Sequence, residues 1–216
     1  MSETVVYGIP GSPYLRSALL ALHEKRAAYR LVVLDGIAGT RSEEHLRRHP
    51  FGRIPVLEQG DFRLYETQAI LRYLDATLPG PSLQPQDPRA AARMNQIMGI
   101  VDWYVFPSVS VGITAERFLA QRFWNRPADE ANIAKALPRA RLCIQELDRL
   151  LGCAQFMAGD ALSLADLLLA PQLLFFRGTP EAQQLMSGTR LDEWLTRMGE
   201  RESVRATEAE RLRQAA

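Results

Sequence analysis

The spacing of apolar residues divides the first part of the chain into short strands and helices. Residues 4–8 (TVVYG) are mostly β-branched or aromatic and end at a glycine, which is typical of a strand. From Tyr14 the apolar residues recur every three or four positions, which predicts a helix. The same two patterns predict further strands at 29–34, 54–58 and 62–65, a weak helix at 42–49, and a helix at 67–78. The order is therefore β-α-β, a loosely helical crossover, then β-β-α.

The pattern changes after Leu78. Residues 79–88 (PGPSLQPQDP) hold four prolines, which indicates an extended linker. Beyond the linker nearly all of the chain has a helical period. Long helices are expected at 89–106, with Pro107 as a kink or an end, at 128–152, with Pro138 as a kink, and at 163–176, which is apolar nearly all round and so buried. We therefore expect an α/β domain over 1–78, a linker over 79–88 and an all-helical domain over 89–216.

Composition and charge argue against several classes of function for this chain. The chain has 216 residues and a formal net charge of +1, so bulk electrostatics gives no reason to expect a nucleic-acid partner. The N-terminus lacks the pattern of a secretory signal, and no run approaches the ~18 apolar residues of a membrane helix. Cys143 and Cys153 form neither a CxxC pair nor part of a His/Cys cluster, which argues against a metal site or a disulfide framework. We expect a cytoplasmic protein with no metal and no membrane partner.

Residues 49–70 (HPFGRIPVLEQGDFRLYETQAI) carry the candidate binding chemistry. If the Ile54–Pro55 bond is cis, the backbone groups of Ile54 turn outward and can pair with a ligand's backbone. Glu66 and Thr67 begin a helix, where free N–H groups and the Thr67 hydroxyl would attract a carboxylate and Glu66 an ammonium. Taken singly, each residue also fits an ordinary trans proline or helix start. Together they fit a γ-glutamyl peptide such as glutathione.

These motifs resemble those of the glutathione S-transferase family over nearly the whole chain. Residues 49–70 are similar to its Asn-Pro-x-Gly-x-Val-Pro and Glu-Ser-x-Ala-Ile blocks, and residues 156–171 to its helical-domain motif. In the latter, Ser163 and Asp166 would form a capping box, which is a folding element. Residues 201–207 resemble the family's C-terminal block. The resemblance is to a bacterial member closest to the phi-like, serine-type pattern. It implies a thioredoxin-like N-terminal domain with a mixed four-stranded sheet, an all-α C-terminal domain, a homodimer and a role in detoxification.

The resemblance also implies glutathione as co-substrate and assigns residues to it. The γ-glutamyl end would lie at Glu66 and Thr67, where Thr67 replaces the commoner serine and keeps the hydroxyl. The cysteinyl backbone would lie at Ile54, next to Pro55. Arg53 stands in place of glutamine or lysine and can still reach a carboxylate.

Further residues follow from the resemblance with less direct support in the motifs. Arg41 lies where some classes place a basic residue for the glycyl carboxylate. Asp102 would reach the glutathione of the partner subunit, as an equivalent acid does in some classes. The electrophile is expected between the domains, at an aromatic pocket that includes Tyr104 and Phe118, although helical aromatics are more often core residues.

Two hydroxyls compete to activate the thiol. A free thiol has a pKa near ~8.5, and lowering it by ~2 units requires ~2.7 kcal/mol of preferential interaction with the thiolate. Ser12 lies in the turn before the first helix, where its hydroxyl and the helix dipole can both face the sulfur. Tyr7 ends the first strand, as the catalytic tyrosine does in several animal classes. The Gly-x-Pro-x-Ser spacing is phi-like and favours Ser12. The alternative interpretations are that Ser12 is only a helix cap and Tyr7 only a core residue.

Three functions remain open at this point. The first is conjugation of glutathione to a small apolar electrophile. The second is a non-catalytic glutathione-binding protein, which would keep the same fold motifs. The third is a related glutathione-dependent isomerase, dehalogenase or peroxidase, because the choice of electrophile depends on the shape of the pocket. The predicted N-terminal domain has no cysteine, which argues against a thiol-transferase.

Overall fold

The computed structural model describes residues 3–215, and its internal contacts divide the chain into two compact units. The first unit is Met1–Leu83 together with Glu200–Ala216, and the second is Gln84–Gly199. The first therefore corresponds to the predicted α/β domain with an addition from the far end of the chain. The second is helical.

A mixed four-stranded sheet forms the centre of the first unit. Its strands are β1 (Thr4–Gly8), β2 (Arg30–Val33), β3 (Val56–Gln59) and β4 (Phe62–Tyr65), in the order β2-β1-β3-β4. β1 and β2 are parallel, whereas β3 is antiparallel to both β1 and β4. All four strands were predicted, including the hairpin between β3 and β4. The thioredoxin-like topology implied by the resemblance is confirmed.

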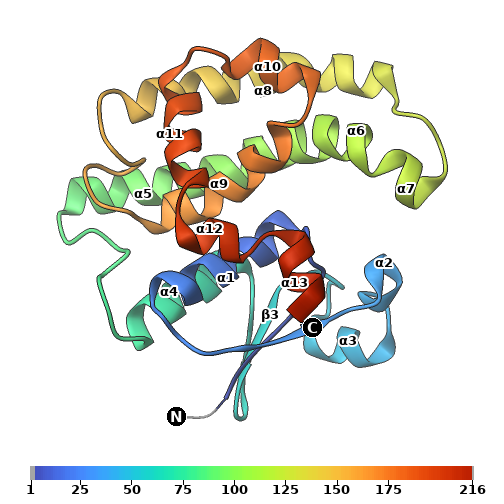
Figure 1. Cartoon of the computed structure of the whole chain (residues 1–216), viewed down its shortest axis with the longest axis vertical. Coiled ribbons are helices and arrows are strands. Elements are labelled where there is room, and N and C mark those ends of the chain that lie inside the picture. The colour runs from blue at the N-terminus through green and yellow to red at the C-terminus, as the bar shows by residue number, and fades with distance from the viewer. Residues whose placement is uncertain (1–2, 216) are drawn as a thin grey trace. The chain divides into compact units, whose positions relative to one another are not determined.

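The helices of the first unit supply its core. They are α1 (Pro13–Glu24), α2 (Gly36–Gly39), α3 (Glu43–Arg48) and α4 (Thr67–Thr77). α1 and α4 pack against each other, and Figure 1 shows them side by side. Their apolar faces are fully buried at Leu15, Leu19, Leu22, Ile70 and Leu74. α2 was not predicted, because its four residues bury no side chain and so give no hydrophobic period.

The last residues of the chain return to the first unit. α12 (Glu202–Ala206) packs on α1, as Figure 1 shows, and α13 (Ala209–Ala215) follows it. Arg201 donates two hydrogen bonds to the Glu24 carboxylate, at 2.9 and 2.8 Å. Arg16 donates to the Val204 carbonyl at 2.7 Å. The predicted helical domain, 89–216, therefore runs past the end of the second compact unit. A helical period shows that a segment is a helix but not which surface it packs on.

A buried ion pair ties the start of the linker to the first unit. The Lys25 Nζ lies 2.6 Å from the Asp75 Oδ1, and both side chains are almost fully buried. Lys25 also donates to the Pro81 carbonyl at 2.7 Å, and the Leu83 N–H donates to Asp75 at 2.8 Å. Because a buried charge must be paired, these contacts hold residues 81–83 in place.

The second unit consists of helices. They are α5 (Pro88–Ile100), the π-helix η1 (Val101–Ala115), α6 (Glu116–Phe118), α7 (Ala120–Trp124), α8 (Glu130–Leu151), α9 (Leu164–Phe176), α10 (Pro180–Met186) and α11 (Arg190–Gly199). η1 packs on α5, α8 and α9, and α5 also packs on α9. The all-α architecture is confirmed, as are the end of α8 at Gly152 and the burial of α9.

Pro107 does not end its helix, contrary to one of the two predicted outcomes. The helical backbone continues from α5 through η1, which contains Pro107, into α6. Side-chain hydroxyls bond carbonyl groups in this stretch: Ser108 donates to Tyr104 at 2.5 Å and Thr114 to Val109 at 2.9 Å. A π-helix changes the backbone pairing around a residue that lacks an N–H, and sequence composition gives no sign of this.

The same helix also corrects the expectation about membrane segments. Pro88–Phe118 is 31 residues long, with a mean hydropathy of 1.4 in its most apolar window, so its length and composition would suffice to span a membrane. The sequence-based expectation considered only uninterrupted runs of apolar residues. It therefore did not consider an apolar window that includes the charged residue Asp102. In the structure this helix is part of the core of the second unit, where η1 packs against α8 and α9.

The capping box predicted at the start of α9 is present. Asp166 is fully buried and accepts four hydrogen bonds. The donors are the N–H groups of Met157 (2.8 Å) and Ser163 (2.9 Å), the Ser163 hydroxyl (2.7 Å) and the Trp194 Nε1 (3.0 Å). Burial raises the pKa of Asp166, and these four donors oppose that rise. The side chain therefore joins α9, α11 and the loop before α9.

Candidate functional site

The register of the sheet brings the predicted binding segments to one place. Val56, the first residue of β3, lies opposite Tyr7 in β1 and opposite Tyr65 in β4. Because both pairings are antiparallel, the segments after Tyr7 and Tyr65 meet the segment before Val56 at one end of the sheet. These segments carry Ser12, Ile54, Pro55, Glu66 and Thr67. Ser12 and Thr67, which are far apart in the sequence, therefore lie at the same end of the sheet.

The Ile54–Pro55 peptide bond is cis, which was one of the two conformations considered from the sequence. Pro55 is buried and Ile54 is half-buried. β3 begins only at Val56, so the Ile54 backbone lies outside the ladder of the sheet. A ligand with an extended backbone can pair with groups in this position as an added strand does.

Glu66 has an unusual backbone conformation, with φ 71° and ψ 112°. Non-glycine residues rarely adopt positive φ, and holding one there costs about 1–3 kcal/mol. Glu66 is the N-cap of α4, its side chain is exposed, and Thr67 behind it is buried. The first turn of α4 leaves backbone N–H groups without intrahelical partners. A ligand carboxylate at Thr67 would accept from these N–H groups, and a ligand ammonium would pair with the Glu66 carboxylate.

Ser12 is the N-cap of α1. Its Oγ accepts from the Leu15 N–H at 3.4 Å, a long hydrogen bond, and the side chain is half-buried. The hydroxyl keeps its own hydrogen for a second partner. Both the hydroxyl and the positive end of the helix dipole are therefore available to an anion at this position.

The C-terminal helix α13 lies beside the turn that carries Ser12. Gly11 has φ +101°, and a Cβ placed on it would lie 3.8 Å from the Ala209 Cβ and 3.9 Å from the Arg213 Nη2. The turn is thus bordered by a guanidinium group from the far end of the chain. Sequence analysis did not predict this neighbour, because no local pattern joins residues two hundred positions apart.

The Tyr7 side chain contacts Glu58 and Arg48. Its hydroxyl donates to the Glu58 carboxylate at 2.7 Å, and the Arg48 guanidinium carbon lies 4.4 Å from the centre of its ring. Burial and the hydrogen bond to Glu58 raise the pKa of Tyr7. A phenol that is held by a carboxylate and resists ionisation is a poor donor to a thiolate. This geometry favours Ser12 over Tyr7, a choice that the sequence left open.

Arg41 and Arg53 are both near the segment that precedes the cis proline. A Cβ on Gly52 would lie 3.1 Å from the Arg41 Nη1, so the Arg41 side chain reaches this segment. The Arg53 side chain is exposed at the next position. Arg41 and Arg53 therefore bring two positive charges to the segment that carries Ile54, and their role in binding a carboxylate stays a prediction.

His45 and His49 were given no role from the sequence, and both are almost fully buried under this segment. The His45 Nε2 lies 2.8 Å from the Arg53 carbonyl oxygen. The His49 ring packs on the Tyr65 ring with centroids 4.5 Å apart. Their spacing of four residues on a helix was the only available signal, since it places two side chains on one helix face.

Acid should weaken the folded state through His49. Burial lowers the pKa of His49, and His45 and Arg53 lower it further. The unfolded chain, with a histidine pKa near ~6.5, then takes up the proton first as the pH falls. Stability is therefore complete above that pH and declines below it, by at most about 1.4 kcal/mol per pH unit for one proton. Urea unfolding of wild type and His49→Asn over this range measures the effect. The variant should show a shallower decline, and equal slopes would contradict the expectation.

The remaining predicted residues lie in the helical unit. Asp102 and Tyr104 are on η1 and Phe118 is on α6. Tyr104 is about half-exposed, with the Arg139 guanidinium carbon 5.9 Å from its ring centre. Phe118 stacks on Phe175 at 5.5 Å, a contact that fits the alternative of a packing role. Their assignment to an electrophile pocket and a partner contact stays a prediction.

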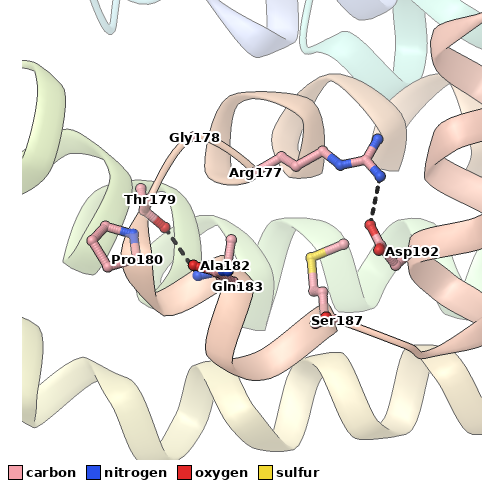
Figure 2. A pocket seen from close by; sticks show the side chains of 9 residues that line it. Arg177, Gly178, Thr179, Pro180, Ala182, Gln183, Ser187 and Asp192 are labelled. Carbon is pink, nitrogen blue, oxygen red and sulfur yellow. Dashed lines mark hydrogen bonds and ion pairs between the residues drawn. The ribbon is translucent and has the colours of Figure 1, made fainter.

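The helical unit has a pocket of about 470 Å³ that contains none of the predicted residues. It lies at the end of α9 and along α10 and the start of α11, as Figure 2 shows. Arg177 closes one side by an ion pair with Asp192 at 2.7 Å. Thr179 caps α10 by accepting from the Ala182 N–H at 3.1 Å. Figure 2 draws both of these contacts on the wall of the pocket.

Comparison with known proteins agrees with this fold. The N-terminal domain model of the glutathione S-transferases matches residues 6–82, and their C-terminal domain model matches residues 130–197. Glutathione S-transferase 4 of Zea mays is 32% identical over 170 residues, which cover 75% of this chain and 72% of the relative. The chain belongs to the glutathione S-transferase family.

Other relatives match over almost their whole length. The probable glutathione S-transferase GSTF1 of Oryza sativa subsp. japonica is 29% identical over 209 residues, 95% of each chain. A solved structure of glutathione S-transferase-I with the ligand lactoylglutathione has a TM-score of 0.84 and 27% identity, and the match covers 96% of this chain and 99% of that one. The resemblance to the phi-like pattern agrees with these plant relatives, whereas a bacterial origin stays a prediction.

Proposed function

We propose that this protein is a glutathione transferase, which activates the thiol of glutathione for attack on an apolar electrophile. The observation that carries the proposal is the meeting of Ser12, Ile54 and the Glu66–Thr67 pair at one end of the sheet. Each supplies a different group that glutathione needs. Family membership supports the same co-substrate, as does the lactoylglutathione bound by the related structure.

The proposed binding mode uses one group of the site for each part of the tripeptide. The γ-glutamyl carboxylate accepts from the Thr67 N–H and hydroxyl, and its ammonium pairs with Glu66. The cysteinyl backbone pairs with the Ile54 backbone next to the cis Pro55. The glycyl carboxylate is bound by Arg41, whose guanidinium group reaches Gly52, or by the exposed side chain of Arg53.

Ser12 then acts on the sulfur. Its hydroxyl donates a hydrogen bond that favours the thiolate over the thiol, and the N-terminus of α1 adds a favourable dipole. The thiol proton leaves to solvent, and the sulfur electron pair forms a C–S bond with the electrophilic carbon. The leaving group departs with its bonding pair, or the new adduct takes up a proton. Binding both reactants at one site supplies proximity in addition to the lowered pKa.

The remaining assignments are part of the proposal. Tyr104 and Phe118 would contact the apolar electrophile, since both are aromatic and at least two-fifths exposed. Asp102 would contact the glutathione of the partner subunit in a homodimer. A cytoplasmic location fits a small-molecule detoxification enzyme. No residue in the proposal requires a metal ion.

Ultraviolet absorbance of the thiolate tests the function directly. Glutathione bound to the wild-type protein should show thiolate absorbance near neutral pH, well below the pKa of about 8.5 for a free thiol. Turnover with a chromogenic aryl halide should accompany it. Binding with an unshifted thiol would instead support the non-catalytic alternative. Thiolate without turnover of aryl halides would direct attention to isomerase, dehalogenase or peroxidase substrates.

Thr67→Ala should weaken glutathione binding and leave the chemical step almost unchanged. A hydrogen bond to a charged group contributes about 1.5–3 kcal/mol, so the KM for glutathione should rise by roughly tenfold or more while kcat at saturation persists. Steady-state kinetics with varied glutathione measures both. Thr67→Ser is the matched control, because it keeps the hydroxyl. Equal KM values for the two variants would contradict a role for the hydroxyl.

A further inference from the structure

The hydrogen bond of the His45 ring requires a hydrogen on one particular nitrogen. Its Nε2 lies 2.8 Å from the Arg53 carbonyl oxygen, and a carbonyl can only accept. The Nε2 must therefore carry the hydrogen and donate it. The side chain is 1% exposed, and its Nδ1 has no hydrogen-bond partner among residues 3–215. Among the described residues, the one hydrogen bond of the imidazole ring is therefore the bond to the Arg53 carbonyl.

The position of that carbonyl decides where the Ile54 N–H points. The Arg53 C=O and the Ile54 N–H belong to the same planar peptide unit, and in a trans unit they point in opposite directions. The cis bond lies one residue later, between Ile54 and Pro55. When His45 holds the carbonyl toward α3, the Ile54 N–H is directed away from α3. This N–H is one of the groups to which the proposed function assigns the cysteinyl backbone.

His49 links the same helix to the second binding segment. Its backbone N–H donates to the His45 carbonyl at 2.8 Å, and its carbonyl accepts from the Gly52 N–H at 2.9 Å, which closes the turn before Arg53. Its ring packs on Tyr65, the residue before Glu66. The end of α3 therefore contacts both the Ile54 segment and the strand that leads to Glu66.

We propose that His45 is a positioning residue, which holds the Arg53–Ile54 peptide in the orientation that binds the peptide backbone of glutathione. The inference rests on the proposed function and deepens it, because it assigns a role at the same site to a side chain that touches no ligand. The geometry requires a donor at the Nε2 position and does not require the imidazole as such. His45 therefore contributes to glutathione binding and not to activation of the thiol, because Ser12 is the residue that acts on the sulfur.

Two substitutions at one position test the need for the donor. His45→Phe keeps a planar ring and removes the donor. His45→Gln places an amide N–H at about the same distance from the backbone as the imidazole Nε2–H. We expect the Kd for glutathione to rise roughly tenfold in His45→Phe, the effect of one lost hydrogen bond, and to stay near wild type in His45→Gln. The pKa of the bound thiol at saturating glutathione should be the same in all three proteins.

Several results would overturn the inference. An unchanged Kd in His45→Phe would show that the donor is not needed, and an equal loss in His45→Gln would show that ring packing is what matters. A shifted thiol pKa in either variant would show an effect on activation. His23→Phe is the control, because His23 is on α1 and its ring nitrogen contacts the Tyr29 hydroxyl at 3.1 Å. If wild type binds no glutathione, the proposed function itself fails, and the two failures are thereby distinguished.

A measurement on the wild-type protein tests the inference even if a substituted protein does not fold. Nitrogen NMR of the histidine rings should show His45 as the Nε2–H tautomer, and the Ile54 amide signal should shift as glutathione is added. The Nδ1–H tautomer would overturn the inference, because its Nε2 could not donate to Arg53. An Ile54 amide that does not respond to bound glutathione would overturn it as well.

Discussion

Replacing Ser12 by alanine is expected to lower kcat/KM for conjugation by about 10²–10³-fold, the usual effect of losing one donor to a developing anion. The pKa of the bound thiol should rise toward its free value of about 8.5, because the hydroxyl and no other side chain is proposed to donate to the sulfur. Glutathione should still bind, since Ile54, Glu66 and Thr67 are unchanged. Thiolate absorbance against pH and glutathione affinity, measured on the same samples, separate the two effects.

Tyr7→Phe is the matched control for Ser12→Ala, because each removes one hydroxyl at the same end of the sheet. The Tyr7 hydroxyl already donates to Glu58, so its loss should leave the thiol pKa where it is. Some loss of stability is expected, since Glu58 loses a hydrogen bond of about 1 kcal/mol. If Tyr7→Phe raises the thiol pKa and Ser12→Ala does not, the assignment of the two hydroxyls is reversed.

Asp166→Ala should be among the most destabilising substitutions in the chain, with a loss of about 3–5 kcal/mol in the free energy of unfolding. The substitution leaves the N–H groups of Met157, Ser163 and Trp194 buried without an acceptor, and each such group costs about 1–3 kcal/mol. It also removes one side of the capping box of α9. Urea unfolding gives the value, provided that the two units unfold in one transition.

Asp160→Ala is the control for that loss, because Asp160 is exposed a few residues before α9. It should change the free energy of unfolding by no more than about 0.5 kcal/mol. Asp166→Asn keeps the shape but presents two N–H donors to neighbours that are themselves donors. It should therefore fall between the control and Asp166→Ala. Similar losses at positions 160 and 166 would refute the role given to the buried carboxylate.

Local patterns were enough for most elements of the fold. The β-branched run at 4–8 and the turn at Gly60 carry their own signals, and both strand β1 and the β3–β4 hairpin are present. Elements without a hydrophobic period were missed, such as α2. The sequence left open whether the helix ends at Pro107, because its continuation depends on the π-helical pairing of η1 and on close packing. A Cβ on Gly112 would lie only 2.6 Å from the Ala136 Cβ on α8.

The candidate site was predicted where its chemistry is local. Glu66 and Thr67 were identified because a helix start has free N–H groups whatever the rest of the fold does. The sequence favoured Ser12 and kept Tyr7 as an alternative, because the hydrogen bond of Tyr7 to Glu58, which lies 51 positions away, gives no local signal. His45 was missed for a related reason: a histidine in a short polar helix gives no sign that its ring is buried against the Arg53 carbonyl.

The return of residues 200–216 to the first unit has a consequence for biosynthesis. A ribosome makes the sheet and α1 first and the partners of Glu24 and Arg16 last. The Ser12 turn therefore lacks its neighbour α13 until the whole helical unit has been translated. Domains generally fold as units during synthesis, the N-terminal one first. Here residues 200–216 of the first unit are synthesised after the helical unit, so the helical unit can fold before the Ser12 turn gains its neighbour α13.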